Sequence, residues 1–408
     1  MKFSLDRLRN DYPRQFWLLF WGMLISTVGA SMIWPFFMIY TSERLSLPLT
    51  TVAFIMTVNA AMGLIFSFIA GPIIDRVGRK WVMVISLCVN GFAYIMMSQA
   101  DTLAAFVVLM GLSGAFNPLY RVGADAMMAD LIHPEKRVDA YSLLRMSNNV
   151  GVAVGPAVGG VIATLSYNLA FFFAAGGMIA YGLLITIFAR ETLPPRLETD
   201  GLHKERFGGY GLILRDRQFM SFIGAFTLTQ MCASLIWVLL AVYAKQNYNV
   251  PESLYGLIPT TNALMVVFLQ LGVTKIVKRH PPLFMISAGT LLYAVGVGSI
   301  SLGQGFAAFW VSMVIFTFGE LMLTPTATTL AANLAPPDKR GRYMSLYGLT
   351  WSVAAGIGPV MGGFLNDNVG PKSIWHGGFL IGLLSASIFM VLARRYSKRA
   401  KSTEGLLI

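Results

Sequence analysis

The chain has 408 residues, of which 56% are hydrophobic and only 12% are charged, and its formal net charge is +12. A soluble protein of this length needs more charged side chains on its surface, so the composition excludes an ordinary soluble domain. The two cysteines and four histidines show neither a disulfide framework nor metal-ligand spacing, so we expect no metal site and no cofactor. No nucleophile or phosphate-binding motif is present, which argues against an enzyme.

Apolar segments of about 20 residues follow one another along the chain, and this length crosses the hydrocarbon core of a bilayer. The sequence therefore predicts an all-α polytopic membrane protein with twelve transmembrane helices. The first segment is longer than the core of a signal peptide, and further spans follow it, so we expect it in the mature protein. The expected spans are 16–40, 49–71, 81–99, 104–128, 141–164, 168–189, 218–243, 253–274, 283–302, 306–331, 343–365 and 374–393.

Basic residues are distributed unevenly among the connections. Of the 31 Lys and Arg side chains, 26 lie in the N-terminus, the even-numbered connections or the C-terminus. Only Arg44, Lys245 and Lys372 lie in the odd-numbered connections. The positive-inside rule then predicts a multi-pass protein of the cell membrane with both termini in the cytoplasm. Because the positive charge is explained as a topology signal, no nucleic-acid partner is expected.

The two halves of the chain resemble each other at a constant offset of 203 residues. The stretch ASMIWPFFMIY from Ala30 returns as ASLIWVLLAVY from Ala233. In the same way, GPAVGG from Gly155 returns as GPVMGG from Gly358. A duplication of six spans keeps both halves in the same orientation, as in transporters built from parallel repeats.

The repeat divides the chain into two bundles and a linker. We expect an N-terminal six-helix bundle at 1–190, a charged cytoplasmic linker at 191–217, and a C-terminal six-helix bundle with a basic tail at 218–408. The two copies differ after their shared Trp, because Pro35 in the first is replaced by Val238 in the second. Proline bends helices, so a kink is predicted in the first span only.

Three motifs carry a resemblance to a known family. GPIIDRVGRK from Gly71 resembles the signature of the major facilitator superfamily between its second and third helices. NVGVAVGPAVGG from Asn149 is similar to a motif of the drug:proton antiporter branch, and FTFGELMLTP from Phe316 is similar to its multidrug exporters. The resemblance implies alternating access, a central cavity lined by helices 1, 4, 7 and 10, and a seam formed by helices 2, 5, 8 and 11.

The GPIIDRVGRK motif predicts a conformational latch. Its two glycines allow a tight turn and close approach of helices. The resemblance implies that Asp75 faces the positive N-terminus of helix 11 and that Arg79 pairs with Asp130 at the end of helix 4. Such contacts can form in one state and break in the other, so we expect a latch on the outward-facing form. The alternative is a solvated topology signal. The predicted latch residues are Gly71, Asp75, Arg76, Gly78, Arg79 and Asp130.

Glycines in the fifth span recur every four residues and predict a smooth face against which a neighbouring helix packs closely. A proline in the same motif bends the helix. The resemblance associates this motif with exporters, but GPVMGG repeats it in the second half, so plain packing is an equal alternative. The motif comprises Arg145, Asn149, Gly151, Gly155, Pro156 and Gly159.

A lone acid, Glu320, stands near the middle of the tenth span, where charge is costly and usually functional. Thr317 and Thr324 share its helical face, which is expected to line the cavity. We interpret Glu320 as the proton carrier: the ionised carboxylate attracts a lipophilic cation, and protonation releases it. The alternative is a structural carboxyl bonded to a neighbouring helix.

The positions in the fourth span that lie 203 residues before Glu320 and its helical face are also polar. They are Asn117, Arg121 and Asp125. Arg121 and Asp125 are spaced to form an ion pair that rigidifies the helix, or Asp125 is a second proton site. Arg145 could snorkel to the cytoplasm, pair with Asp125, or bind an anionic substrate.

Two tryptophans, Trp34 and Trp237, occupy equivalent positions in the first and seventh spans. They either belong to an aromatic belt at the membrane surface or present their rings to aromatic and cationic substrates. The predicted substrate cavity comprises Trp34, Asn117, Arg121, Trp237, Thr317 and Thr324.

These features predict a monomeric secondary active transporter that couples proton entry to the export of lipophilic, often cationic compounds. A multidrug exporter of this kind would confer antibiotic resistance. One alternative is a proton-coupled transporter of one specific metabolite or antibiotic, possibly an anion held by Arg121 or Arg145. Another is a facilitator or membrane sensor that does not use protons.

Overall fold

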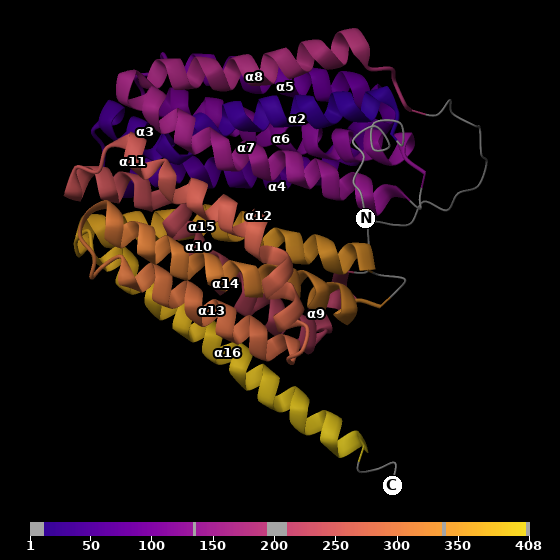
Figure 1. The fold of residues 1–408 in the computed structure, drawn as a ribbon, viewed down its shortest axis with the longest axis vertical. Helices are drawn as coiled ribbons and strands as arrows, with labels where there is room; N and C mark the ends of the chain where they lie inside the picture. The colour runs from indigo at the N-terminus through magenta and orange to yellow at the C-terminus, as the bar shows by residue number, and fades with distance from the viewer. Residues whose placement is uncertain (1–11, 134–135, 194–209, 337–339, 405–408) are drawn as a thin grey trace. The chain divides into compact units, whose positions relative to one another are not determined.

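The computed structural model describes residues 12–133, 136–193, 210–336 and 340–404. Within them, 12 helices are long and apolar enough to cross a membrane, and the predicted all-α polytopic architecture is confirmed. Between its ends, an α-helix satisfies its backbone hydrogen bonds internally, which a span in lipid requires. The helices of each unit run side by side (Figure 1).

The first half of the chain forms seven α-helices and one 3-10 turn among the described residues. They are α2 (Arg14–Ile33), η1 (Trp34–Phe36), α3 (Phe37–Leu45), α4 (Leu49–Val77), α5 (Arg79–Met97), α6 (Leu103–Leu131), α7 (Arg137–Leu165) and α8 (Tyr167–Phe188).

The second half repeats this order, with a short additional helix before the first long one. Its described helices are α9 (Tyr210–Arg215), α10 (Arg217–Tyr248), α11 (Glu252–Tyr255), α12 (Leu257–Val277), α13 (Pro282–Ser299), α14 (Gly305–Leu334), α15 (Arg340–Asn368) and α16 (Ser373–Glu404).

The chain forms two compact units. Unit 1 comprises Met1–Ser46, Ile55–Glu198 and Pro251–Ala263, and unit 2 comprises the remainder. The first turns of α4 therefore belong to unit 2, while α11 and the first turns of α12 belong to unit 1. The predicted boundary at 191–217 lies largely outside the described residues and stays a prediction.

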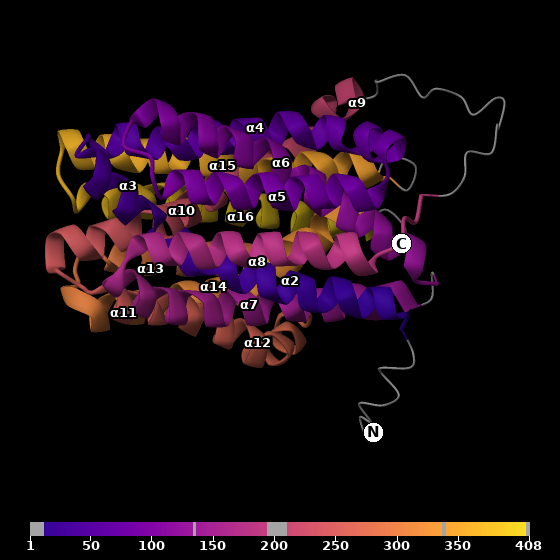
Figure 2. The ribbon, with the colours of Figure 1, turned by 90° about the horizontal axis from the view of Figure 1, so that it is seen from above.

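Each unit has an aromatic core between its helices. In unit 1, α2 packs against α7 and α8, and these helices lie side by side in Figure 2. Phe16 and Tyr181 are completely buried there. In unit 2, Phe222 and Phe226 of α10 stack on Tyr347 of α15, with ring centroids 6.2 and 4.9 Å apart. These rings fix the helices around which each unit is organised.

The predicted kink of the first span is confirmed. Helix α2 ends at Ile33, a 3-10 turn containing Pro35 follows, and α3 resumes at Phe37. The equivalent α10 runs without interruption through Val238. Proline has no backbone N–H to donate and its ring displaces the carbonyl four residues earlier, so the helix breaks where Pro35 stands.

One expectation about the loop motif is wrong. The sequence predicts that Gly71 and Gly78 together form a tight turn, but α4 continues through Gly71 to Val77, and the turn lies at Gly78 alone. Among the described residues, a Cβ atom at Gly71 would have no neighbour within 4 Å, so none of them approaches closely there. The helix persists because Ala70 and Ile74 are buried in an apolar cluster with Leu119 of α6.

The glycine motif of α7 packs against α2. A Cβ atom on Gly155 would lie 2.8 Å from the Val28 carbonyl oxygen, and one on Gly159 would clash with the Met32 backbone. The equivalent Gly358 in α15 lies against α10 in the same way. Because both units use these glycines for the same internal contact, the structure favours plain packing for this helix face.

Replacing Gly159 by Ala is expected to lower the free energy of unfolding by about 1–3 kcal/mol, because the methyl group has no room beside Met32. Gly176→Ala in α8 is the matched control, since nothing lies within 4 Å of its Cβ position. The midpoint of thermal unfolding in detergent measures both. Equal midpoints for the two variants would contradict the packing assignment.

Candidate functional site

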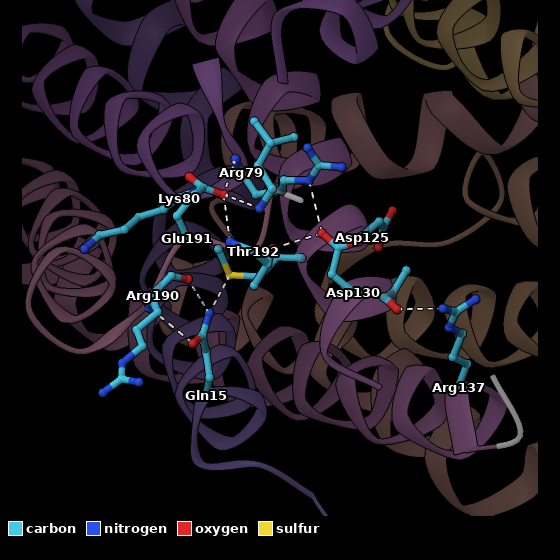
Figure 3. Close-up of polar contacts among 12 residues, drawn as sticks. Gln15, Arg79, Lys80, Asp125, Asp130, Arg137, Arg190, Glu191 and Thr192 are labelled. Atoms are coloured by element: carbon cyan, nitrogen blue, oxygen red, sulfur yellow. Dashed lines mark hydrogen bonds and ion pairs between the residues drawn. The ribbon is translucent and has the colours of Figure 1, made fainter. Parts of the chain in front are cut away.

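A polar network lies in unit 1 at the end of the helices where the basic connections lie, here called the basic end (Figure 3). Gly78 ends α4 with a φ of 103°, a conformation that favours glycine, and α5 begins at Arg79. Arg79 Nε donates a hydrogen bond to Asp130 Oδ2 in the last turn of α6 at 3.1 Å. The structure thus brings this predicted pair together, while its function as a latch stays a prediction.

The carboxylate of Glu191, just after α8, caps the start of α5. Its Oε1 accepts from the Arg79 N–H at 2.9 Å, and its Oε2 accepts from the Lys80 N–H at 3.1 Å. The first N–H groups of a helix have no partner within the helix, and the preceding Gly78 has no side chain to offer one. An acid from another segment supplies both the hydrogen bonds and the negative charge that a helix N-terminus favours.

Two neighbours of Glu191 extend the network. The Thr192 hydroxyl donates to Asp130 Oδ2 at 3.0 Å, so this oxygen also receives a bond besides that from Arg79. Arg190 exchanges backbone hydrogen bonds with the Gln15 amide of α2, at 2.8 and 3.2 Å. The segment after α8 is therefore bonded to α2, α5 and α6 together. Sequence reasoning treated it only as linker, although an acid directly after the last helix of the half was a usable signal.

The electrostatics of Glu191 depend on these backbone contacts. Burial raises the pKa of its carboxyl, but hydrogen bonds from the N–H groups of Leu193, Arg79, Thr192 and Lys80 outweigh burial and lower the pKa below its ordinary value of 4.5. The ionised Glu191 carboxylate therefore stabilises the fold fully when the pH lies above the ordinary pKa of 4.5. This stabilisation is lost as the pH falls through the lower value of the folded state.

Glu191→Gln is expected to lower the free energy of unfolding by about 1 kcal/mol at neutral pH, the typical loss for a helix cap. The difference in free energy of unfolding between the variant and the wild type should stay constant from pH 8 to pH 6. It should shrink below pH 4.5, where Glu191 of the wild type becomes protonated and loses its charge. Thermal unfolding across this pH range measures it. A difference that grows toward acid pH would contradict the assigned direction.

The remaining predicted latch residues lie on α4 or at its end. Arg76 is exposed in the last turn of α4. Asp75 lies in the same turn, but its side chain is outside the described residues. Its predicted contact with helix 11 therefore stays a prediction.

The predicted stripe of α6 forms an exposed polar face. Asn117, Arg121 and Asp125 are all exposed, as is Arg145 on α7. Among the described residues, no ion pair within 4.0 Å joins either arginine to Asp125. The predicted rigidifying pair is thus not formed in this structure, and both guanidinium groups are open to solvent or ligand.

In unit 2, Glu320 is half-buried in α14 beside Tyr293 of α13. The Tyr293 ring stacks on Phe316 of α14 with centroids 4.0 Å apart, and its hydroxyl lies near Glu320 and Thr324. The prediction that Thr317 lines the cavity is wrong for this structure, because Thr317 is completely buried. Its hydroxyl bonds the Met313 carbonyl oxygen of its own helix at 2.7 Å, which makes burial inexpensive.

The two equivalent tryptophans differ in environment. Trp34 lies in the 3-10 turn of unit 1 and is 44% exposed. Trp237 of unit 2 is half-buried and packs edge-on against Phe316, with centroids 6.2 Å apart. Trp237 therefore lies on the side of α10 that faces α14, the helix that carries Glu320.

Comparison with known proteins decides the family. The profile described as Major Facilitator Superfamily matches residues 19–359, and also matches residues 222–406. The chain belongs to the Major Facilitator Superfamily. It is a multi-pass membrane protein and a secondary transporter rather than an enzyme.

Relatives within the superfamily cover nearly the whole chain. One, from Bacillus subtilis (strain 168), is named an uncharacterized MFS-type transporter, YttB, and is 28% identical over 96% of this chain and 97% of its own. A "Na(+), Li(+), K(+)/H(+) antiporter" from Planococcus maritimus is 24% identical over 96% and 98%. "Multidrug resistance protein MdtH" from Yersinia pestis (strain Pestoides F) is 22% identical over 94% and 95%.

Solved structures agree on the fold. A POT family transporter in complex with a thioalcohol conjugated peptide superimposes with a TM-score of 0.78 at 19% identity, covering 95% of this chain and 96% of its own. At this identity the likeness shows the fold of the superfamily and leaves the substrate open.

Proposed function

We propose that this transporter exchanges protons for lipophilic, often cationic compounds by alternating access, with both termini in the cytoplasm. The observation that carries the proposal is Glu320, a half-buried acid in the middle of a membrane-spanning helix. A carboxyl at such a depth costs free energy, so an acid found there usually has a function. Two of the relatives are named for antiport with protons and for multidrug resistance, which supports the same reaction class.

The proposed mechanism is competition at one carboxyl. Ionised Glu320 attracts a cation, and protonation from the side of higher proton concentration releases it. Thr324 lies on the same face and offers a hydroxyl, while Trp34 and Trp237 offer aromatic faces suited to cations. Asp125 on the exposed face of α6 is the proposed second proton site. Each net elementary charge that crosses the membrane is worth about 2.3 kcal/mol per 100 mV, so the membrane potential drives the exchange only when more protons than substrate charges cross.

We further propose that the Arg79–Asp130 pair, with Asp75, Arg76 and Gly78, holds one of the two transport states. The Arg79 side chain is largely buried and the Asp130 side chain is partly exposed, with exposures of 11% and 27%. The shared Asp130 oxygen and the Glu191 cap join α5, α6 and the segment after α8 at the basic end of unit 1. A bonded group of this kind changes as a unit when the surrounding helices move.

The direct test is transport by the purified protein in vesicles with an imposed pH gradient. A lipophilic cation should accumulate against its gradient on the side of higher proton concentration, and collapse of the pH gradient should stop it. Equal efflux with and without the gradient would overturn the antiport proposal and favour a facilitator.

A second substrate class, an anion, is favoured by one observation. The guanidinium groups of Arg121 and Arg145 are exposed, and no ion pair with Asp125 neutralises them within the described part of the chain. Two such groups can bind a carboxylate or phosphate with charge-assisted hydrogen bonds. Tight binding of one anionic compound, abolished by Arg121→Ala and unaffected by Glu320→Gln, would select this class.

A further inference from the structure

At the end of the helices opposite the basic end, an acid of α15 caps the start of α4. The Leu49 N–H donates to Asp367 Oδ1 at 3.2 Å, and the Thr50 N–H donates to Asp367 Oδ2 at 2.8 Å. The Thr50 hydroxyl adds a bond to Oδ2 at 2.7 Å. All three residues belong to unit 2.

The cap satisfies the N–H groups that the helix leaves unpaired. The N–H groups of Thr51 and Val52 already bond the Pro48 carbonyl oxygen, so Leu49 and Thr50 are the donors that still need acceptors. Pro48, directly before the helix, has no side-chain acceptor to offer. A carboxylate at this place satisfies both donors and adds a negative charge at the positive end of the helix.

A glycine one turn earlier in α15 lets α4 approach this closely. A Cβ atom on Gly363 would lie 2.7 Å from the Thr50 backbone N and Cα. Gly160, at the equivalent position of α7, lies against the backbone of Glu252 at the start of α11 in unit 1. There the polar contact differs, because the Tyr167 hydroxyl donates to the Glu252 carboxylate. The two glycines therefore make equivalent close contacts, but the two acids differ, since Asp367 accepts hydrogen bonds from the N–H groups at the start of a helix and Glu252 accepts one from a side-chain hydroxyl.

The cap joins a helix that both units share. Residues 47–54 belong to unit 2, whereas α4 from Ile55 onward belongs to unit 1. We propose that Asp367 is a positioning residue for transport, whose carboxylate holds the first turn of α4 in unit 2 in one state and releases it in the other. This inference rests on alternating access, but on neither the proton site nor the substrate.

The test measures the separation of α4 and α15 at this end. Spin labels on Leu47→Cys and Val369→Cys, both exposed residues of unit 2, report it by pulsed EPR in lipid nanodiscs, with the two native cysteines replaced by Ala. We expect the short-distance population to predominate over the long-distance one in the parent protein. In Asp367→Asn, the ratio of long to short distances should rise about tenfold, the typical effect of losing a charged hydrogen-bonded cap.

Controls separate a released cap from a loosened fold. Asp367→Glu keeps the carboxylate and should restore the short distance. Asp101→Asn neutralises another exposed acid, the partner of Arg44 in unit 1, and should leave the distribution unchanged. The proposal is overturned if Asp367→Asn matches the parent, or if Asp101→Asn shifts the distribution equally.

A variant that fails to fold does not end the test. Thr50→Val removes only the hydroxyl bond at 2.7 Å and should shift the distribution in the same direction by a smaller factor. If Asp367→Asn is unstable and Thr50→Val leaves the distance distribution unchanged, the cap serves folding alone and the transport role is overturned. Because no substrate or pH gradient is present, failure here leaves the proton-antiport proposal intact.

Discussion

Replacing Glu320 by Gln is expected to abolish substrate accumulation driven by a pH gradient. One coupled proton at a difference of two pH units supports a substrate ratio of about 100-fold, because each tenfold ratio corresponds to about 1.4 kcal/mol. Gln keeps the size and hydrogen-bonding capacity of the side chain beside Tyr293 but cannot bind a proton. The ratio across vesicles should therefore fall to about one, and binding of the cation should weaken, because the carboxylate that attracts it is absent.

Glu43→Gln is the matched control for this experiment. Glu43 is an exposed acid of α3, so the same chemical change there should leave the substrate ratio at the wild-type value. A Glu320→Gln protein that still accumulates substrate in response to the gradient would remove Glu320 from the mechanism. Asp125→Asn then becomes the next variant to measure, since Asp125 is the other acid proposed to carry protons.

Breaking the Arg79–Asp130 pair has the second largest expected effect. A hydrogen bond between charged groups contributes about 1.5–3 kcal/mol, and this pair is bonded through Arg79 Nε at 3.1 Å. Asp130→Asn should therefore change the balance between transport states by about a factor of ten or more and slow transport accordingly. Arg79→Lys should also slow transport, although it keeps the positive charge, because an ammonium group lacks the planar geometry of the guanidinium group.

The Arg44–Asp101 pair provides the comparison. It also joins an arginine to an aspartate, but its side chains are 46% and 66% exposed, and such surface pairs contribute about 0–1 kcal/mol. Transport rates of Asp101→Asn and Asp130→Asn, each normalised to the amount of folded protein, give the contrast. Equal rates for the two variants would reduce the Arg79–Asp130 pair to a topology signal.

Several features follow from the sequence because they depend on segments close together in the chain. The long apolar segments predict the membrane-spanning helices, since a span is defined by its length and lack of charge. Pro35 predicts the break between α2 and α3, because its effect acts on its own turn. The glycine spacing in α7 predicts a close helix contact for the same reason.

The partners of these features required the tertiary structure. The spacing of Gly155 and Gly159 does not reveal that α2 is the helix that packs against them. The pair Arg79 and Asp130 was expected only through resemblance to a family, since 51 residues separate them. The buried position of Thr317 and the open arginines of α6 and α7 likewise depend on which neighbours cover each helix face.

The sequence by itself determined the class of the protein, its helical spans, its internal repeat and the acid at the centre of α14. Only the tertiary structure revealed that Glu191 caps α5 and that Asp367 caps α4. The unpaired N–H groups at the start of a helix need an acceptor, and the sequence shows where they occur. In both cases the acceptor comes from a distant segment, 111 or more residues away along the chain, so only folding decides which acid meets these N–H groups.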